Sequence, residues 1–264
     1  MKVLLVNPIT RDTSLSSPDL GLGYLARALE KENHKVDILD CVNLRLTFEK
    51  FEHYIAGIDF DVIGFRVFST DLFSVKKSLL IVKKRRPDAK IILGGAHPSA
   101  FPEQTLQYFE EADFAIRGEA EKGLADLIRN FQDPDIVRKE NISGLIWRES
   151  KDIKINSPVF PENLDSLGSP DWNLINPRNY PFQTSYLIKS KFVAPLIMTR
   201  GCPYQCTFCS CRSVTGHRIR FHSIPYIIEE IKFLKSNFGI KEICFIDDNF
   251  LVLRHLVIDL CEQI

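Results

Sequence analysis

The sequence has no excess of charge of either sign and no long apolar run. Its 264 residues include 34 basic and 34 acidic side chains, so no net charge draws the chain toward nucleic acid or an anionic membrane surface. No stretch approaches the ~18 consecutive apolar residues of a membrane span. The apolar start at residues 1–6 is too short for a signal peptide. These absences predict a cytoplasmic protein with neither a membrane span nor a nucleic-acid partner.

The seven cysteines lack the pattern of a disulfide framework or of paired zinc knuckles. Their number is odd, and the chain is long for a disulfide-stapled domain. Cys202, Cys206 and Cys209 follow the spacing C-x3-C-x2-C, with Phe208 directly before the last cysteine. Since iron–sulfur clusters normally take four cysteines, three thiolates on one loop would leave one iron open to another ligand. A zinc site with Cys211 as fourth ligand and a set of buried thiols are the alternatives.

Short apolar runs alternate with amphipathic stretches over the first half of the chain. We expect strands at 2–6, 35–39, 62–67, 90–93 and 113–116, and helices at 19–33, 48–56, 71–86, after 102 and at 119–131. Strands interleaved with helices predict a parallel sheet with right-handed crossovers. The expected architecture is an α/β doubly wound sheet that binds ligands at the carboxyl ends of its strands.

A hairpin at 142–155 and a proline-rich segment come after this region. We therefore predict a first domain over 1–140, a hairpin and linker over 141–185, and a second domain over 186–264. In the second domain we expect a strand leading straight into the cysteines, then a helix, a strand and a further helix, at 193–199, 223–238, 241–246 and 251–264. Two parallel strands cannot bury both faces of a sheet, so the chain is expected to be a fragment of a longer protein.

Glycines mark candidate ligand contacts in the first domain. Gly94 and Gly95 end an expected strand, where the missing Cβ permits close approach of the backbone to a ligand. Gly21 and Gly23 lie inside the first expected helix, where each costs roughly 1 kcal/mol relative to Ala. They indicate close approach of a packed strand or of a flat ligand. No G-x-G-x-x-G directly follows the first strand, which disfavours a nicotinamide dinucleotide.

The cysteine run resembles the motif of the radical S-adenosylmethionine (SAM) superfamily, in which SAM fills the open iron position. The runs 20–26, 94–98 and 117–121 together resemble the cobalamin-binding domain that precedes many radical SAM domains. This resemblance implies a flavodoxin-like N-terminal sheet followed by the start of a radical SAM partial (β/α) barrel. The D-x-H-x-x-G motif of cobalamin mutases is absent, so the resemblance implies cobalamin bound without a protein histidine on cobalt.

The resemblance also implies roles for single residues. The three motif cysteines would hold a [4Fe-4S] cluster, and Phe208 would pack beside the adenine of SAM. Asp247 or Asp248 would contact the amino group of SAM, because a carboxylate pairs with an ammonium by charge-assisted hydrogen bonds. An N-cap of the next helix is the alternative for these acids. The four glycines would face cobalamin, and His97 would lie near its nucleotide tail or be a plain loop residue.

The implied activity is that of a cobalamin-dependent radical SAM enzyme. SAM would be cleaved reductively at the cluster, with electrons from a donor such as flavodoxin or ferredoxin, and methylcobalamin would supply a methyl group to a small-molecule biosynthetic intermediate. A radical SAM cyclase or rearrangement enzyme and a non-catalytic corrinoid-binding fragment are the alternatives. The tRNA methylthiotransferases are less expected, since their first domain brings its own cluster cysteines and only Cys41 lies in this one.

Overall fold

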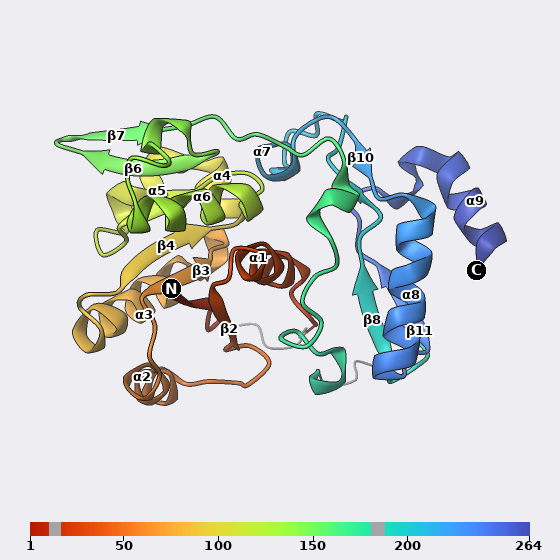
Figure 1. The fold of residues 1–264 in the computed structure, drawn as a ribbon, viewed down its shortest axis with the longest axis horizontal. Coiled ribbons are helices and arrows are strands. Elements are labelled where there is room, and N and C mark those ends of the chain that lie inside the picture. Colours follow the sequence, from red (N-terminus) through yellow and green to blue (C-terminus); the bar gives the residue numbers. More distant parts are fainter. Residues whose placement is uncertain (11–16, 181–187) are drawn as a thin grey trace.

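The computed structural model describes residues 1–10, 17–180 and 188–264. A large α/β unit and a smaller one lie side by side and are joined by an extended segment (Figure 1). The predicted start of the second domain at residue 186 lies outside the described residues. Within the described ranges, no helix reaches the length and hydropathy needed to cross a membrane.

The larger unit is built on one seven-stranded sheet. Its strands are β1 (Lys2–Asn7), β2 (Lys35–Asp40), β3 (Val62–Arg66), β4 (Lys90–Gly94), β5 (Phe114–Ile116), β6 (Leu145–Glu149) and β7 (Asp152–Ile155). They are ordered β2-β1-β3-β4-β5-β6-β7, and the first five are parallel. This arrangement confirms the predicted doubly wound sheet. The order reverses between β1 and β3, which makes the carboxyl ends of these two strands the switch point where such sheets bind ligands.

Helices cover both faces of this sheet. They are α1 (Leu20–Glu30), α2 (Phe48–Gly57), α3 (Leu72–Arg85), α4 (Ala96–Ala100), α5 (Pro102–Tyr108) and α6 (Glu121–Gln132), with short 3-10 turns at η1 (Ser69–Asp71) and η2 (Lys139–Asn141). Apolar residues of α1 and α6 pack on one face of the sheet, and those of α2, α3 and α5 pack on the other. The alternation of residues along each strand sends neighbours to opposite faces, so Leu4 and Leu5 belong to different cores.

The hairpin β6–β7 extends the large sheet beyond residue 140. This hairpin lies in the predicted linker, and in the structure β6 pairs antiparallel with β5, so that Phe114 lies opposite Trp147. The apolar side chains of β6 are the reason, because Leu145, Ile146 and Trp147 are all buried in the cores of the sheet. The sheet therefore extends to Ile155 rather than ending near residue 140.

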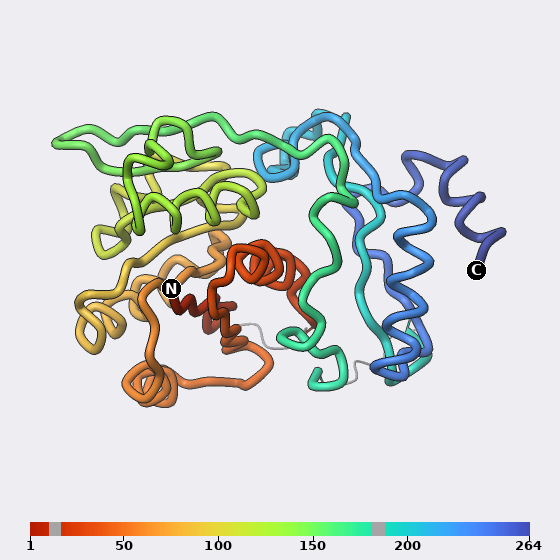
Figure 2. The backbone as a smooth tube through the Cα atoms, viewed as in Figure 1, coloured from red at the N-terminus to blue at the C-terminus, as the bar shows by residue number. Residues whose placement is uncertain are grey.

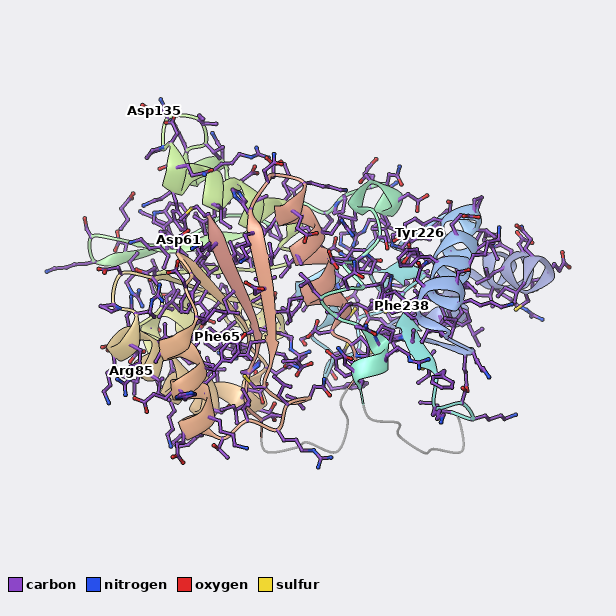
Figure 3. The ribbon with its side chains drawn as sticks, turned by 60° about the horizontal axis from the view of Figure 1, so that its bottom comes forward. Asp61, Phe65, Arg85, Asp135, Tyr226 and Phe238 are labelled. Atoms are coloured by element: carbon purple, nitrogen blue, oxygen red, sulfur yellow. The ribbon has the colours of Figure 1, made fainter. Side chains whose placement is uncertain are left out.

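The smaller unit contains two short sheets. Its elements are β8 (Val193–Leu196), β9 (Thr199–Arg200), α7 (Cys211–Thr215), β10 (Arg220–Phe221), α8 (Ile224–Phe238), β11 (Glu242–Phe245), η5 (Phe250–Leu253) and α9 (Arg254–Gln263). β8 pairs in parallel with β11, and β9 pairs antiparallel with β10. The single strand expected at 193–199 is thus split between two sheets. Helix α8, along which Figure 3 marks Tyr226 and Phe238, begins at the predicted N-cap Ser223 and ends at Gly239, which has φ +64°.

Helix α1 belongs to two hydrophobic cores. Leu22, Ala26 and Leu29 face the large sheet, whereas Leu20 and Tyr24 pack against the joining segment and the smaller unit. The joining segment includes the turns η3 (Leu164–Leu167) and η4 (Pro177–Asn179) and passes between α1 and the smaller unit (Figure 2). The two units therefore share a packed interface.

Candidate functional site

A cavity of about 300 Å³ lies between the two units, at the carboxyl ends of β1, β3 and β4. Apolar side chains of the large sheet form one wall, among them Leu5, Ile92 and Ile116. The opposite side is formed by residues at the ends of strands of the smaller unit, including Thr199 and Asp248. The cavity thus lies beside the switch point of the sheet, where a doubly wound fold is expected to bind its ligand.

Three of the four predicted glycines line this cavity, namely Gly21, Gly94 and Gly95. A Cβ added to Gly94 would meet no atom within 4 Å, so the glycine leaves open space. Gly95 has φ +97°, a backbone conformation that side chains disfavour, and its Cβ would lie 3.2 Å from the backbone of Val67. This open, apolar wall at the strand ends fits a large ligand that approaches the backbone closely.

Gly23 and His97 are not among the residues that line the cavity. A Cβ on Gly23 would lie 2.6 Å from Ile175 Cδ1 and 3.0 Å from Pro170 Cβ, so the close approach expected at this helix position is made by the joining segment. The His97 ring is largely buried, and its Nδ1 lies 2.9 Å from Ser69 Oγ. Burial lowers the pKa of His97. In this structure Gly23 packs against the joining segment, and His97 contacts Ser69 of the large unit.

The three motif cysteines lie on the loop that joins β9 to β10. All are free thiols, with Cys202 half-buried and Cys206 and Cys209 exposed. In the described part of the chain, no three His, Cys, Asp or Glu side chains stand close enough to form a metal-holding group. Three soft sulfur donors nevertheless suit iron–sulfur clusters or zinc rather than hard cations such as Mg²⁺. The donor set fits the predicted cluster, while the thiols lie apart on a loop of irregular structure.

Phe208 points away from the rest of the protein. Its side chain is 92% exposed, and it does not line the cavity. Tyr204 on the same loop is also exposed. The predicted contact of Phe208 with adenine therefore stays a prediction about the loop in its ligand-bound form.

The two predicted aspartates make different contacts. The Asp247 carboxylate accepts hydrogen bonds from the backbone N–H groups of Met198 and Thr199, at 3.1 and 2.5 Å, and from Thr199 Oγ1 at 2.6 Å. Burial raises the pKa of Asp247, and these hydrogen bonds oppose the rise. The N-cap position of the next turn belongs to Asn249. Asp247 thus ties the end of β11 to the turn between β8 and β9.

Asp248 instead faces the cysteine loop. Its Oδ2 accepts a hydrogen bond from Cys211 Sγ at 2.8 Å and lies 3.4 Å from Thr215 Oγ1. Burial, reinforced by the hydrogen bond to Asp248, raises the pKa of the Cys211 thiol to about 12. Cys211 is therefore a protonated donor to a carboxylate. Of the two aspartates, Asp248 has the more exposed carboxylate at the cavity.

Four buried charges at the interface were not recognised as a group in the sequence. Arg200 Nη1 lies 2.7 Å from Glu121 Oε1, and Arg220 forms two hydrogen bonds with Glu119, at 2.5 and 3.0 Å. The sequence signal was the pair of acids within 117–121 and an arginine two residues before the first motif cysteine. The partners are 79 and 101 residues apart, so sequence spacing could not join them.

A buried histidine is a second feature that the sequence did not indicate. The His222 ring is fully buried and stacks on Tyr226, with ring centroids 4.1 Å apart. Its Nδ1 lies 3.0 Å from Asp165 Oδ1, and the ring of Tyr24 of α1 lies nearly parallel to it, with the centroids 6.3 Å apart. Burial lowers the pKa of His222 to about 4, although Asp165 opposes the shift. The ring is therefore neutral at neutral pH and joins α1, the joining segment and the smaller unit.

Two known families match separate parts of the chain. Residues 7–128 match the B12 binding domain, and residues 196–263 match the radical SAM superfamily. The first match includes strands β2 to β5 and the glycines that line the cavity, and the second begins just before the cysteine loop. The chain therefore combines a match to the B12 binding domain with a following match to the radical SAM superfamily.

Individual proteins are similar to this chain over its whole length or nearly so. An uncharacterized methyltransferase of Pyrococcus horikoshii is 31% identical over 275 residues, which cover the whole chain and 57% of the relative. The anaerobic magnesium-protoporphyrin IX monomethyl ester cyclase of Cereibacter sphaeroides is 24% identical and is covered to 43%. The cobalamin-dependent SAM radical enzyme OxsB, solved with aqua-cobalamin and SAM, superposes with a TM-score of 0.80 over 99% of this chain and 36% of OxsB, at 22% identity. The chain thus spans about half the length of the curated relatives it matches.

Proposed function

We propose that the chain binds cobalamin, a [4Fe-4S] cluster and SAM, and that it serves methyl transfer to a small-molecule substrate. The observation that carries this proposal is the shared cavity. One of its walls is formed by Gly94 and Gly95 of the B12-binding domain, and the other by Thr199, Arg200 and Asp248 around the base of the cysteine loop. A single cavity therefore connects the two predicted cofactor sites.

Residues of the larger unit would bind cobalamin, and residues of the smaller unit would bind the cluster and SAM. Gly94 leaves open space at the end of β4, and Gly21 in the first turn of α1 lines the same cavity. Cys202, Cys206 and Cys209 would supply the thiolates, and Asp248 is the exposed carboxylate suited to the amino group of SAM. In this reaction class the cofactors supply the reductive cleavage of SAM and the transferred methyl group. The electron for this cleavage would come from an external donor such as flavodoxin or ferredoxin.

Methyl transfer is proposed over cyclisation because the 31% identical relative is described as a methyltransferase. The 24% identical cyclase keeps radical chemistry without methylation as the second candidate. The two differ in their products, since only a methyltransferase moves the methyl group of SAM to the substrate. Label from methyl-labelled SAM that appears on cobalamin supports the first candidate, and its absence from cobalamin supports the second.

Cobalamin binding can be tested by anaerobic titration with hydroxocobalamin, monitored in the visible spectrum. Gly94→Leu places a side chain in the open space of the cavity and should weaken binding about tenfold or more. Gly57→Leu is the matched control, because a Cβ at Gly57 at the end of α2 also meets no atom within 4 Å and lies away from the cavity. Equal binding by the two variants would contradict the cavity assignment.

The cluster can be tested by anaerobic reconstitution with iron and sulfide, and then by metal analysis and a SAM-cleavage assay. Serine at Cys202, Cys206 or Cys209 should abolish iron binding, whereas Cys211→Ser should retain it. Zinc in place of iron, together with loss of metal in Cys211→Ser, would favour the four-cysteine zinc site. Both cofactors bound without formation of 5′-deoxyadenosine would favour the corrinoid-binding fragment.

A further inference from the structure

The two ends of the cysteine loop are held by the same small group of charges. Arg200 closes β9 directly before the loop, and Arg220 opens β10 directly after it. The two arginines lie opposite each other in the antiparallel pair β9–β10. Both guanidinium groups point to the B12-binding domain, where Glu119 lies after β5 and Glu121 begins α6. The loop that carries the cysteines is therefore attached to the other domain at both of its ends.

The geometry of these contacts is specific. Glu119 accepts two hydrogen bonds from Arg220 and also lies 3.3 Å from Arg200, so it bridges both ends of the loop. Glu121 accepts from Arg200 at 2.7 Å. All four side chains are 10% exposed or less. Buried arginine–carboxylate contacts of this kind fix orientation as well as distance, because the guanidinium is planar.

Aromatic rings and carbonyl groups complete the arrangement. The Arg200 guanidinium lies over the Tyr24 ring of α1 at 4.8 Å, and that of Arg220 lies over the Phe160 ring at 5.2 Å. Arg220 also donates to the carbonyl oxygen of Thr215, at the end of α7 within the loop. Burial by itself would lower the pKa of Arg200, but Glu121 and Glu119 raise it overall, so the guanidinium stays charged.

Docking of the two domains has a separate basis. The apolar core that α1 shares with the smaller unit, with Leu20 packed among residues such as Trp172 and Ile227, holds the domains together. The charged group lies at the cavity, since Glu119, Glu121 and Arg200 all line it. Loss of the charged contacts should therefore loosen the loop while the domains remain docked.

We propose that Glu119 and Glu121 are positioning residues that set the place of the cysteine loop relative to the B12-binding domain. This inference rests on the proposed function, because it assigns the two acids the task of fixing the distance between the two cofactor sites. They act through Arg200 and Arg220, whose guanidinium groups they contact. Their effect should appear as a change in the geometry of the loop rather than as a loss of cofactor.

The first test is the distance between cob(II)alamin and the reduced cluster, measured by pulsed electron paramagnetic resonance in the reconstituted chain. Wild-type protein should give one narrow distance distribution. The double variant Glu119→Gln/Glu121→Gln should broaden it, with cobalt and iron contents unchanged. Glu229→Gln, which removes an exposed carboxylate 2.8 Å from Lys232 on α8, is the control and should leave it narrow. An unchanged distribution in the double variant would overturn the proposal.

The second test needs no cofactor and is amide hydrogen exchange of the base of the loop. The amides of Cys202 and Gly216 are hydrogen-bonded within the loop, and they should exchange about tenfold faster in the double variant. If the double variant does not fold, Glu121→Asp takes its place in the test. It keeps the charge but shortens the side chain, and it should give a smaller increase in the exchange rate of the same amides. Equal exchange in wild type and both variants would refute the positioning role. Failure of the wild type to bind cobalamin or iron would instead refute the proposed function.

Discussion

Replacement of Asp247 by alanine tests whether this carboxylate is structural. Asp247→Ala leaves three donors without their partner, namely two backbone N–H groups and the hydroxyl group of Thr199. An unsatisfied buried donor costs ~1–3 kcal/mol. Because the cavity beside Asp247 can admit water, we take the lower end and expect a loss of about 3 kcal/mol of unfolding free energy. Asp247→Asn keeps the accepting oxygen and should cost about 1 kcal/mol or less.

The assay is urea unfolding monitored by the fluorescence of Trp147 and Trp172, which are both buried. With an m-value of about 3 kcal/mol/M, the Asp247→Ala midpoint should fall by about 1 M urea. Asp248→Ala is the control, since its exposed carboxylate bonds mainly to the Cys211 thiol. A wild-type midpoint for Asp247→Ala would refute this reasoning, and weaker SAM binding by Asp247→Asn at unchanged stability would support a contact with SAM instead.

Three further predictions concern buried groups. Burial lowers the folded-state pKa of His222 to about 4, against an ordinary value of 6.5. Up to about 3 kcal/mol of unfolding free energy should therefore be lost as the pH falls from 6.5 to 4, because the unfolded chain takes up this proton first. His222→Gln should flatten the dependence of unfolding free energy on pH in this window, and an unchanged dependence would contradict the assignment. Burial raises the pKa of Glu230, whose Oε2 accepts a hydrogen bond from Trp172 Nε1 at 2.9 Å. In thermal unfolding, Glu230→Gln should be at least as stable as wild type, because it keeps an accepting oxygen without a buried charge. Glu230→Leu removes the acceptor and should be ~1–3 kcal/mol less stable. Gly144 has φ +68°, and a Cβ added there would overlap the carbonyl oxygen of Arg117 just after β5. Gly144→Ala should therefore lower the free energy of urea unfolding by at least ~2 kcal/mol. Equal urea midpoints for Gly144→Ala and wild type would contradict this strain.

The local elements could be predicted because their signals lie within one short window. The apolar strands and the amphipathic helices of the first domain follow from residue periodicity, and Ser223 marks the start of α8 through its own side chain. The three cysteines are likewise recognisable from spacing alone. Such signals need no knowledge of what lies elsewhere in the fold.

Partner identity could not be predicted in the same way. The sequence indicated a close approach at Gly23 but not that Pro170 and Ile175 make it. It showed an apolar hairpin but not that β6 pairs with β5, and it showed acids near residue 119 but not the arginines 79 and 101 residues away. Each of these depends on contacts between distant segments, which charge and periodicity within a window do not encode.

The position of α1 in two cores makes the B12-binding domain physically dependent on the segments C-terminal to it. Leu20 and Tyr24 are both buried, and removal of the joining segment and the smaller unit would expose them to water. Exposure of a large buried apolar side chain to water costs ~1.5–3 kcal/mol, so the loss at these two residues is a substantial fraction of the unfolding free energy of a typical domain. The two family matches therefore describe modules of sequence, whereas heat or denaturant should unfold them as one cooperative unit.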